Sequence, residues 1–319
     1  MFLIFIDRFD KIIFLKYINL VMANINTSAL SNYVEEHNIP LINNIVLGSS
    51  IVRDMTKQTG VKTKARIHYL STDPTFQDGS ACGFNAAGSA ALTEREIETG
   101  LIKINYEFCN NELLGKYAEY LVRISAGAED LGFEKELMDS IIANIQKKLE
   151  KMIFLGDKDN SDMFNGLIKV SKDAGVSEDV LTKSDGAYAN IKQVYMSLPE
   201  EAIDKGATIY VSPATYREFT QELVAKNLFH YSGPIDAYPT EIVFPGTDTK
   251  VKRAAGLAGT DYILAGVPKD WFYGCDMEGA NEEIKVWYSN DQDVVRMKVL
   301  FNAGVQVAFA NEVKIGKRQ

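Results

Sequence analysis

The sequence predicts an α+β chain, in which long strands, one long helix and a mixed α/β section follow one another. Three observations lead to this prediction. Residues 62–70 and 97–108 alternate apolar and polar side chains, and residues 130–154 repeat apolar side chains at every fourth position. After them the 319-residue chain alternates helical and strand-like patterns and then becomes β-rich. A period of two predicts strands, and a period near four predicts a helix.

The N-terminal part of the chain divides at Met22. Residues 1–21 consist almost entirely of Phe, Ile, Leu, Lys, Asp, Asn and Tyr, and charged residues interrupt the apolar run that a signal peptide needs. This bias is typical of translated AT-rich upstream sequence, so we expect a non-native extension with the natural start at Met22; an interfacial helix is the alternative. Residues 22–60 are irregular, with a helix expected over 31–38 and a break at Pro40. We interpret residues 22–60 as an extended N-terminal arm.

The two alternating stretches are expected to form an extended hairpin over residues 61–108. The apolar face of the second stretch consists of Ile102, Ile104, Tyr106 and Phe108. Between the two stretches lies a polar tip that contains Gly79, Gly83 and Gly88. A hairpin with one half-polar face is marginally stable by itself. It therefore needs a partner surface, either in its own chain or in a neighbouring copy.

Residues 130–154 carry the clearest helix pattern. Acidic residues gather at its start and lysines at its end, as the helix dipole favours. We interpret its apolar stripe as packing and not as a ligand site; the stripe comprises Leu137, Ile141, Ile145, Leu149 and Ile153.

The remaining sequence alternates helix and strand signals before it becomes β-rich. A helix is expected to end before Pro199, and residues 207–211 read as a short buried strand. Ser212 is a good N-cap for a helix that has Pro213 at its first position. The C-terminal strands are expected at residues 284–288 and 294–309, after short strands broken by Gly and Pro.

Composition and charge exclude several classes of protein. The chain is 46% hydrophobic and has 34 basic against 43 acidic residues, a formal charge of -9. This balance argues against a protein that wraps nucleic acid, which would need a broad basic face. Cys82, Cys109 and Cys275 are too few and too scattered for a disulfide framework, so we interpret them as reduced thiols. No segment has the 18 or so consecutive apolar residues that a membrane span needs.

Motifs that would carry chemistry are incomplete. The stretch Gly83–Ala90 has the glycine spacing of a phosphate-binding loop but lacks its lysine. Asp157, Asp159 and Asp162 suggest a 12-residue calcium-binding loop that starts at Asp157. Such a loop needs glycine at its sixth position and glutamate at its twelfth, but the chain has Asp162 and Ile168 there. We interpret these aspartates as a solvated junction between a helix and a loop. The three histidines lie far apart, without metal-ligand spacing: His37, His68 and His230.

Two further groups have a structural and a functional interpretation. Trp271 and Trp287, with the neighbouring aromatic residues Phe272 and Tyr273, favour core or interface packing over stacking on a base or sugar. The basic group Lys314, Lys317 and Arg318 is adequate for weak contact with nucleic acid and insufficient for holding it. The sequence therefore predicts no catalytic residue, no cofactor-binding residue and no metal ligand.

The order of the elements resembles the major capsid protein of tailed bacteriophages with the Hong Kong 97-like fold. The stretch Phe154–Asp157 followed by Phe164–Ile168 resembles the passage that follows the spine helix in that family. Residues 207–216 resemble its axial strand and helix, and residues 262–269, 284–288 and 294–313 its C-terminal strands. The likeness covers roughly Gly60 to Lys314.

This resemblance implies a division of the chain and a function. It implies an N-terminal arm (22–60), an extended hairpin called the E-loop (61–108), a peripheral domain with the spine helix (109–185), an axial domain (186–270) and C-terminal strands that return to the peripheral domain (271–319). The upstream extension, residues 1–21, precedes these segments. It implies a non-enzymatic subunit that assembles in the bacterial cytoplasm into hexamers and pentamers of an icosahedral head. Expected partners are other copies of the chain, a portal, a scaffolding protein, a maturation protease and, weakly, packaged double-stranded DNA. Lysine–asparagine cross-links occur in a minority of related shells, and here Lys62, Lys64, Asn85 and Asn105 are available.

Two other classes remain open from the sequence. An encapsulin-like compartment shares the fold but encloses an enzyme cargo. An α/β enzyme or ligand-binding protein with an unrecognised site would also have the alternation seen over residues 187–226. The tendency to form rings, tubes or shells distinguishes both kinds of shell protein from the enzyme.

Overall fold

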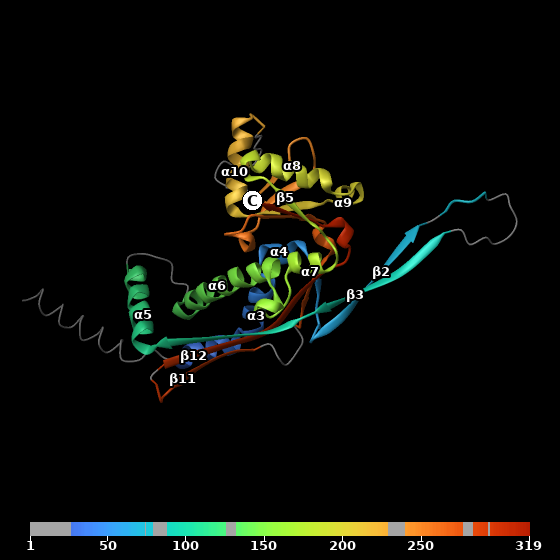
Figure 1. Cartoon of the computed structure of the whole chain (residues 1–319). Helices are drawn as coiled ribbons and strands as arrows, with labels where there is room; N and C mark the ends of the chain where they lie inside the picture. Colours follow the sequence, from blue (N-terminus) through green and yellow to red (C-terminus); the bar gives the residue numbers. More distant parts are fainter. Residues whose placement is uncertain are drawn as a thin grey trace, which may run out of the picture. The chain divides into compact units, whose positions relative to one another are not determined.

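A computed structural model of the chain describes residues 27–73, 75–78, 88–125, 132–228, 240–276, 283–292 and 294–319 (Figure 1). These residues form two compact units, each assembled from three stretches of the chain. Unit 1 contains residues 1–45, 102–145 and 280–301, and unit 2 contains residues 46–101, 146–279 and 302–319. Among the residues that the structure describes, none of the helices combines the length and the apolar character that a bilayer span requires.

Unit 1 packs helices against strands. Its helices are α2 (Thr27–Glu36), most of α3 (Asn38–Leu47), α5 (Asn110–Ser125) and the first part of α6 (Phe133–Leu155). Its strands are β11 (Glu283–Ser289) and parts of β4 (Gly100–Cys109) and β12 (Val294–Val307). In β12, Val295, Met297 and Val299 are buried as the alternation predicted. Helix α2 lies along β11, where Ser31 Oγ donates to the carbonyl of Val286 at 3.1 Å. A helix side chain thus satisfies a backbone group of this strand.

The N-terminal segment differs from the extended arm that the sequence predicted. Residues 27–54 form three helices: α2, α3 (Asn38–Leu47) and α4 (Ser50–Asp54). Pro40 does not break the chain, because it is the third residue of α3, where a backbone N–H has no intrahelical partner to lose. Ile45 and Val46 are completely buried, so the irregular pattern concealed an apolar helix face.

The long helix is confirmed as α6, 23 residues over Phe133–Leu155. It ends against the segment that leads into α7 (Leu167–Asp173), through close contact between two glycines. Gly166 N donates to the carbonyl of Gly156 at 2.8 Å, and a Cβ on Gly166 would lie 2.6 Å from Gly156 N. The aromatic residues beside these glycines, Phe154 and Phe164, are buried. This junction requires glycine because backbone touches backbone.

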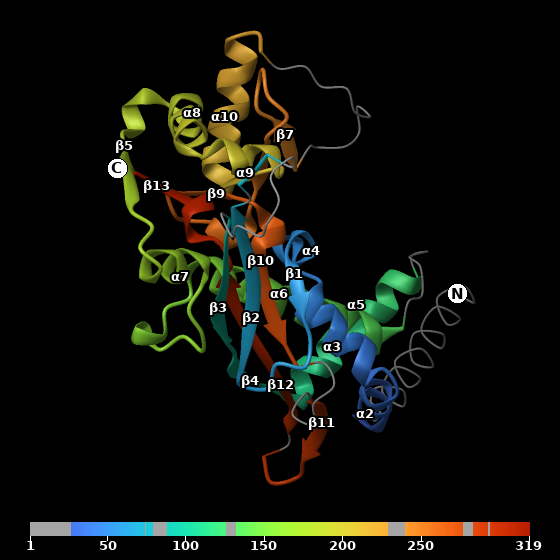
Figure 2. The ribbon, with the colours of Figure 1, turned by 90° about the vertical axis from the view of Figure 1, so that its right-hand side faces the viewer.

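Unit 2 contains a six-stranded sheet in the order β5-β13-β9-β6-β8-β7 (Figure 2). Its strands are β5 (Glu178–Leu181), β6 (Thr208–Val211), β7 (Glu241–Val243), β8 (Lys250–Arg253), β9 (Tyr262–Gly266) and β13 (Lys314–Arg318). Helices α8 (Ala187–Ser197) and α10 (Pro213–Ala225) pack on one face, and α9 (Glu200–Asp204) precedes β6. The predicted helix start is confirmed, since Ser212 Oγ accepts from Thr215 N at 3.2 Å.

A second set of strands in unit 2 pairs around β10 (Trp271–Cys275). It pairs in parallel with β1 (Thr56–Gln58) and antiparallel with the last residues of β12. Trp271 and Tyr273 are buried there, as the packing interpretation predicted, and the Trp271 ring lies 5.5 Å from that of Tyr210.

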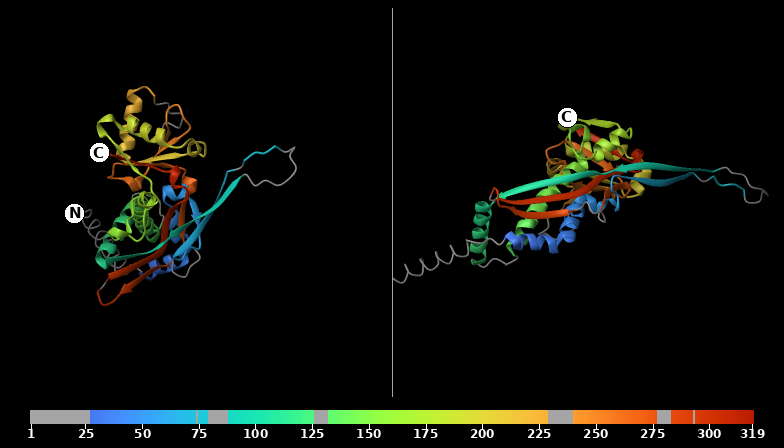
Figure 3. Two further views of the ribbon diagram at one scale, coloured as in Figure 1. Left: turned by 45° about the vertical axis from the view of Figure 1, so that its right-hand side comes forward. Right: turned by 90° about the horizontal axis from the view of Figure 1, so that it is seen from below.

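The hairpin exists, but its register differs from the prediction. Strand β2 (Lys64–Asp73) pairs antiparallel with β3 (Ser89–Glu98), and the alternating residues 100–109 form the next strand, β4 (Figure 3). Thr99 separates β3 from β4: its N–H donates to the carbonyl of Thr63 at 2.8 Å. Residues 97–108 alternate through this break without a change of pattern, so periodicity alone could not locate it.

Candidate functional site

The β2–β3 hairpin carries a row of paired charges that we call the charged ladder. Lys64 lies 2.5 Å from Glu96, and Arg66 lies 3.3 Å from Glu94. Lys158, in the 3-10 turn that follows α6, lies 3.0 Å from Glu98 of the hairpin. The Lys64–Glu96 hydrogen bond is the main cause that raises the pKa of Lys64 and lowers the pKa of Glu96. Every member of the ladder is exposed, so this face of the hairpin is hydrated.

The opposite face of the hairpin is apolar near its base. Ile67 and Ile97 are buried with Val61, and Phe272 packs against this small cluster. The Tyr69 ring meets the edge of Phe309 at 4.8 Å between centroids. Gln306 Nε2 donates to the carbonyl of Glu96 at 2.7 Å, which fixes the backbone of β3. These contacts hold the base of the hairpin on unit 2.

The described residues near the end of the hairpin are fully accessible. Residues 75–78 are all exposed, and Phe76 is 96% exposed. An apolar ring of this size in water costs about 1.5–3 kcal/mol relative to a buried one. Phe76 is therefore a candidate contact for another molecule. Residues 79–87, which include Gly79, Gly83 and most of the glycine-rich stretch, lie outside the described residues.

The aspartates that suggested a calcium loop are occupied by protein donors. Asp157 caps a short 3-10 turn by accepting from Asp159 N at 3.1 Å, and Asp162 accepts from Asp157 N at 2.9 Å. Lys169 lies 3.1 Å from Asp159, and the pKa of Lys169 is raised, chiefly by this hydrogen bond. No cluster of three or more His, Cys, Asp or Glu residues that could hold a metal occurs in the described part of the chain.

Two of the three histidines, His37 and His68, lie in the described part of the chain. His37 stacks on Tyr33 at 4.5 Å, and His68 lies 3.6 Å from Glu94. His230 lies outside the described residues. Trp287, unlike Trp271, is 44% exposed, on β11.

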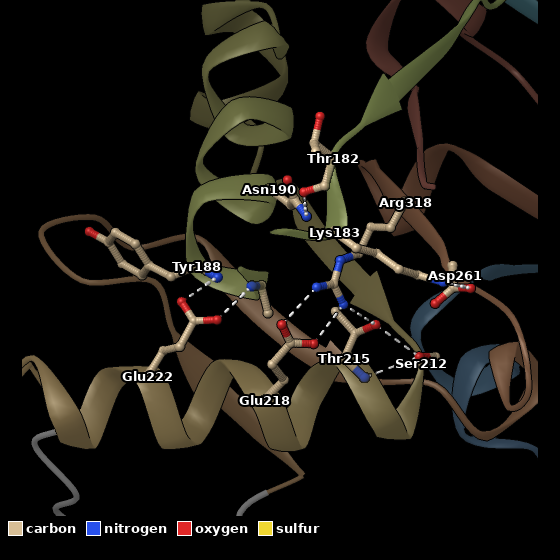
Figure 4. A network of polar contacts seen from close by, with 11 residues as sticks. Thr182, Lys183, Tyr188, Asn190, Ser212, Thr215, Glu218, Glu222, Asp261 and Arg318 are labelled. Atoms are coloured by element: carbon tan, nitrogen blue, oxygen red, sulfur yellow. Dashed lines mark hydrogen bonds and ion pairs between the residues drawn. The ribbon is translucent and has the colours of Figure 1, made fainter. Parts of the chain in front are cut away.

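The basic C-terminal group is not the surface patch that the sequence suggested. Arg318 is buried: its guanidinium donates to both carboxylate oxygens of Glu218 at 2.8 Å and to Thr215 Oγ1 at 3.3 Å (Figure 4). Lys317 lies over the Tyr262 ring at 5.3 Å. Arg318 is buried because β13 lies inside the sheet, between β5 and β9.

The lysines and asparagines available for a cross-link lie in different segments of the chain. Lys62 precedes β2, and Asn105 lies within β4. Lys64 pairs with Glu96, and Asn85 lies outside the described residues. The cross-link remains a prediction of the resemblance.

Sequence reasoning missed two polar groups in unit 2. Tyr210 donates to Asp54 at 2.8 Å beside Lys252, and burial, followed by Asp54, raises the pKa of this tyrosine. These residues line a hollow of about 410 Å³. Glu150 is buried on α6, where it accepts from Ser50 Oγ at 3.2 Å and from Gly256 N at 3.3 Å. Neither group has a local sequence signal, since the partners come from distant parts of the chain.

No protein-family model matches the chain, and no curated protein matches it. Solved structures do match. The procapsid of satellite phage P4 with its size determination (Sid) protein gives a TM-score of 0.60 at 10% identity, over 88% of this chain and 90% of that one. The capsid of an empty GTA particle gives 0.55 at 12% identity, over 85% and 90%. The holo-SrpI encapsulin complex from Synechococcus elongatus gives 0.52 at 11% identity, over 84% and 86%.

These likenesses define the fold of the chain. It is the α+β fold of capsid and encapsulin shell proteins, the Hong Kong 97-like fold that the sequence resemblance implied. At such low identity the comparisons concern architecture and assign no residue a role.

Proposed function

We propose that the chain is the major capsid protein of a tailed bacteriophage or prophage, a structural and non-enzymatic subunit that assembles into hexamers and pentamers around double-stranded DNA. The observation that carries the proposal is the β2–β3 hairpin, which ends in exposed residues and the 96% exposed ring of Phe76 on a fold whose matched structures are shells. A two-stranded ribbon of this kind is marginal alone. Heterologous contacts between copies would cover it.

The proposal also assigns parts of the chain. Strands β2 and β3 act as the projecting hairpin within the predicted range 61–108. Residues 109–185 act as the peripheral domain and 186–270 as the axial domain, whose sheet also takes in β5 and β13. The other strands of 271–319 return to the peripheral domain. The subunit assembles in the bacterial cytoplasm and ends in the virion. A portal, a scaffolding protein and a maturation protease are its proposed partners. Contact with packaged DNA is weak, because the chain carries a net charge of -9.

The test is assembly of the full chain, followed by sedimentation and negative-stain electron microscopy. We expect rings, tubes or closed shells. A monodisperse monomer or dimer at every protein and salt concentration tried would contradict the proposal. The variant Phe76→Ser is expected to keep the fold and reduce assembly, since it removes an apolar contact that forms only between copies. Met196→Ser is the matched control, because Met196 on α8 is 71% exposed and lies outside the hairpin.

An encapsulin-like compartment is the second candidate, favoured by the match to the encapsulin complex. The contents of shells purified from the native source distinguish the two. Double-stranded DNA inside the shells supports the capsid, and a co-purified protein cargo without DNA supports the compartment.

A further inference from the structure

Three charged side chains from separate segments of unit 2 meet at one place. Lys205 follows α9, Asp270 ends a 3-10 turn before β10 (Pro268–Asp270), and Glu312 ends another before β13 (Ala310–Glu312). Glu312 is 3% exposed, and Lys205 Nζ donates to its Oε1 at 2.5 Å. The same ammonium lies 4.9 Å from the centre of the Phe309 ring. We call Asp270 and Glu312 the acid pair.

One oxygen of each carboxyl group in the acid pair lacks a donor among the described residues. Asp270 Oδ2 and Glu312 Oε2 are buried, and no donor among the described residues reaches either of them. An ionised carboxylate only accepts hydrogen bonds. When one of its oxygens is buried without a donor, that oxygen loses its hydrogen bonds to water and gains none from the protein. The charges are also unbalanced, because a single lysine faces two carboxyl groups. One proton added to the pair supplies both the missing donor and the missing positive charge.

We propose that Asp270 is protonated in the folded protein and donates a hydrogen bond to Glu312, so that the acid pair acts as a proton-linked latch between the segments that precede β10 and β13. Burial is the largest cause that raises the pKa of Asp270, and the charge of Glu312 raises it further, while Lys205 opposes both. The pKa of Lys205 is raised in turn, first by its hydrogen bond to Glu312, with Asp270 and Glu201 adding to the effect. These are the charged groups that face the pair.

The latch connects backbone contacts on both sides of β10. The Asp270 carbonyl accepts from Ala308 N at 2.9 Å, just beyond the end of β12. The neighbouring Lys269 carbonyl accepts from Thr56 Oγ1 at 2.6 Å, at the start of β1. Loss of the proton would leave two facing carboxylates beside these contacts. The latch therefore stabilises the strand ends around β10 only while the proton is bound.

The direction of the pH effect follows from linkage. An Asp whose pKa is higher in the folded than in the unfolded chain contributes stability that is present below its unfolded value, about 3.9, and is lost as the pH rises through the folded value. Within that window, the unfolding equilibrium constant rises by at most about tenfold per pH unit. The inference does not depend on whether the chain builds a shell.

The test compares urea unfolding of the unassembled full chain with that of Asp270→Asn from about pH 4, near the unfolded pKa of Asp, to pH 8. The introduced amide donates to Glu312 at every pH, so we expect the variant to gain stability relative to wild type as the pH rises. Asp261→Asn is the matched control, because Asp261 pairs with the half-exposed Lys183 at 2.7 Å; its difference from wild type is expected not to grow. Parallel pH profiles for Asp270→Asn and wild type would overturn the latch.

Two further measurements separate the latch from a general change in stability. An infrared titration from pH 4 to pH 8 is expected to show a protonated carboxyl band that persists to higher pH than the bands of exposed carboxyl groups, and that Asp270→Asn removes and Asp261→Asn retains. Lys205→Met removes the cation that opposes protonation, so the pH window in which stability falls is expected to move upward. If the infrared band is the same in all variants, or if Lys205→Met moves the window downward, Asp270 does not hold the proton.

Discussion

Two of the regions in unit 2 where charged side chains pair differ in burial. On the hairpin, Lys64 and Glu96 lie 2.5 Å apart with side chains 52% and 47% exposed. Between β13 and α10, Arg318 and Glu218 lie 2.8 Å apart, with side chains 4% and 42% exposed. Both partners are solvated in the first region, whereas the arginine is dehydrated in the second. Exposed pairs contribute about 0–1 kcal/mol, whereas breaking a buried pair costs several times more.

This difference indicates how each region is held. The sheet is stabilised from within, by its apolar cluster and by a polar network whose partners come from three elements (Figure 4). The hairpin is fixed at its base by Tyr69, Ile97 and Gln306. Its charged ladder adds little stability, because the paired charges are already hydrated. Beyond the base, by contrast, the ring of Phe76 is 96% exposed.

The largest effect is expected where no charge is involved, at the glycine contact after α6. A Cβ in Gly166→Ala would lie 2.6 Å from Gly156 N and 2.7 Å from Met152 O, which are backbone atoms that cannot rotate away. The φ of Gly166 is -78°, so alanine suffers no backbone strain and the effect is steric. We expect a loss of about 3 kcal/mol or more.

The chain has two tryptophans, Trp271 in unit 2 and Trp287 in unit 1, which allows this loss to be measured by unit. In a Trp287→Phe background, the fluorescence of Trp271 reports unfolding of unit 2. Gly115→Ala is the control, because nothing lies within 4 Å of its Cβ position in helix α5, and alanine favours a helix by about 1 kcal/mol over glycine. Equal stability of Gly166→Ala and wild type would show that the junction can relax.

The second effect tests the buried side of the comparison. Arg318→Met removes three hydrogen bonds and leaves Glu218, which is 42% exposed and can be rehydrated. We expect a loss of about 2 kcal/mol, below the roughly 3–5 kcal/mol for breaking a fully buried pair, because Glu218 can be rehydrated. The double variant Arg318→Met with Glu218→Met is expected to recover part of it, because apolar replacement of both partners is often neutral. A single variant as stable as wild type in urea unfolding would place Arg318 with the exposed pairs.

Much of the fold could be predicted because its signals are local. The Ser212–Pro213 start of α10, the alternation of β12 and the stripe of α6 depend on neighbouring residues, and all three are confirmed. The partner of β2 could not be predicted, because the alternation runs across the break at Thr99. The helix across Pro40 was missed because a proline in a first turn and a proline that ends a helix look the same without the flanking contacts.

The candidate site was less accessible to sequence reasoning. The need of the hairpin for a partner followed from its half-polar face, but the exposure of Phe76 is a tertiary property. Arg318 had the signature of a surface cation, and only the insertion of β13 into the sheet buries it. Asp270 and Glu312 lie 42 positions apart, by 312 − 270, and no local pattern pairs them.

An intermediate effect is expected at the start of α8, where the cap residue is Gly186 and has no side chain to offer. Glu222 of α10 replaces it by accepting from Ala187 N at 2.6 Å and Tyr188 N at 3.1 Å (Figure 4). Glu222→Ala should cost about 1 kcal/mol, as for loss of a cap. Glu222→Gln keeps an acceptor oxygen and should cost less. The Trp271 signal in urea measures both, and equal losses would argue against capping.

The smallest effect is expected on the ladder. Lys64→Ala, alone or with Glu96→Ala, should change the stability of the subunit by less than about 0.5 kcal/mol, because both side chains are half-exposed and water replaces each partner. The double-mutant cycle isolates the coupling between them, and high salt should reduce it further. A coupling energy above about 1 kcal/mol would mean that the ladder is effectively dehydrated. If such coupling appears only in assembled particles and not in the free subunit, a neighbouring copy covers this face, and the ladder then behaves like the buried Arg318 pair.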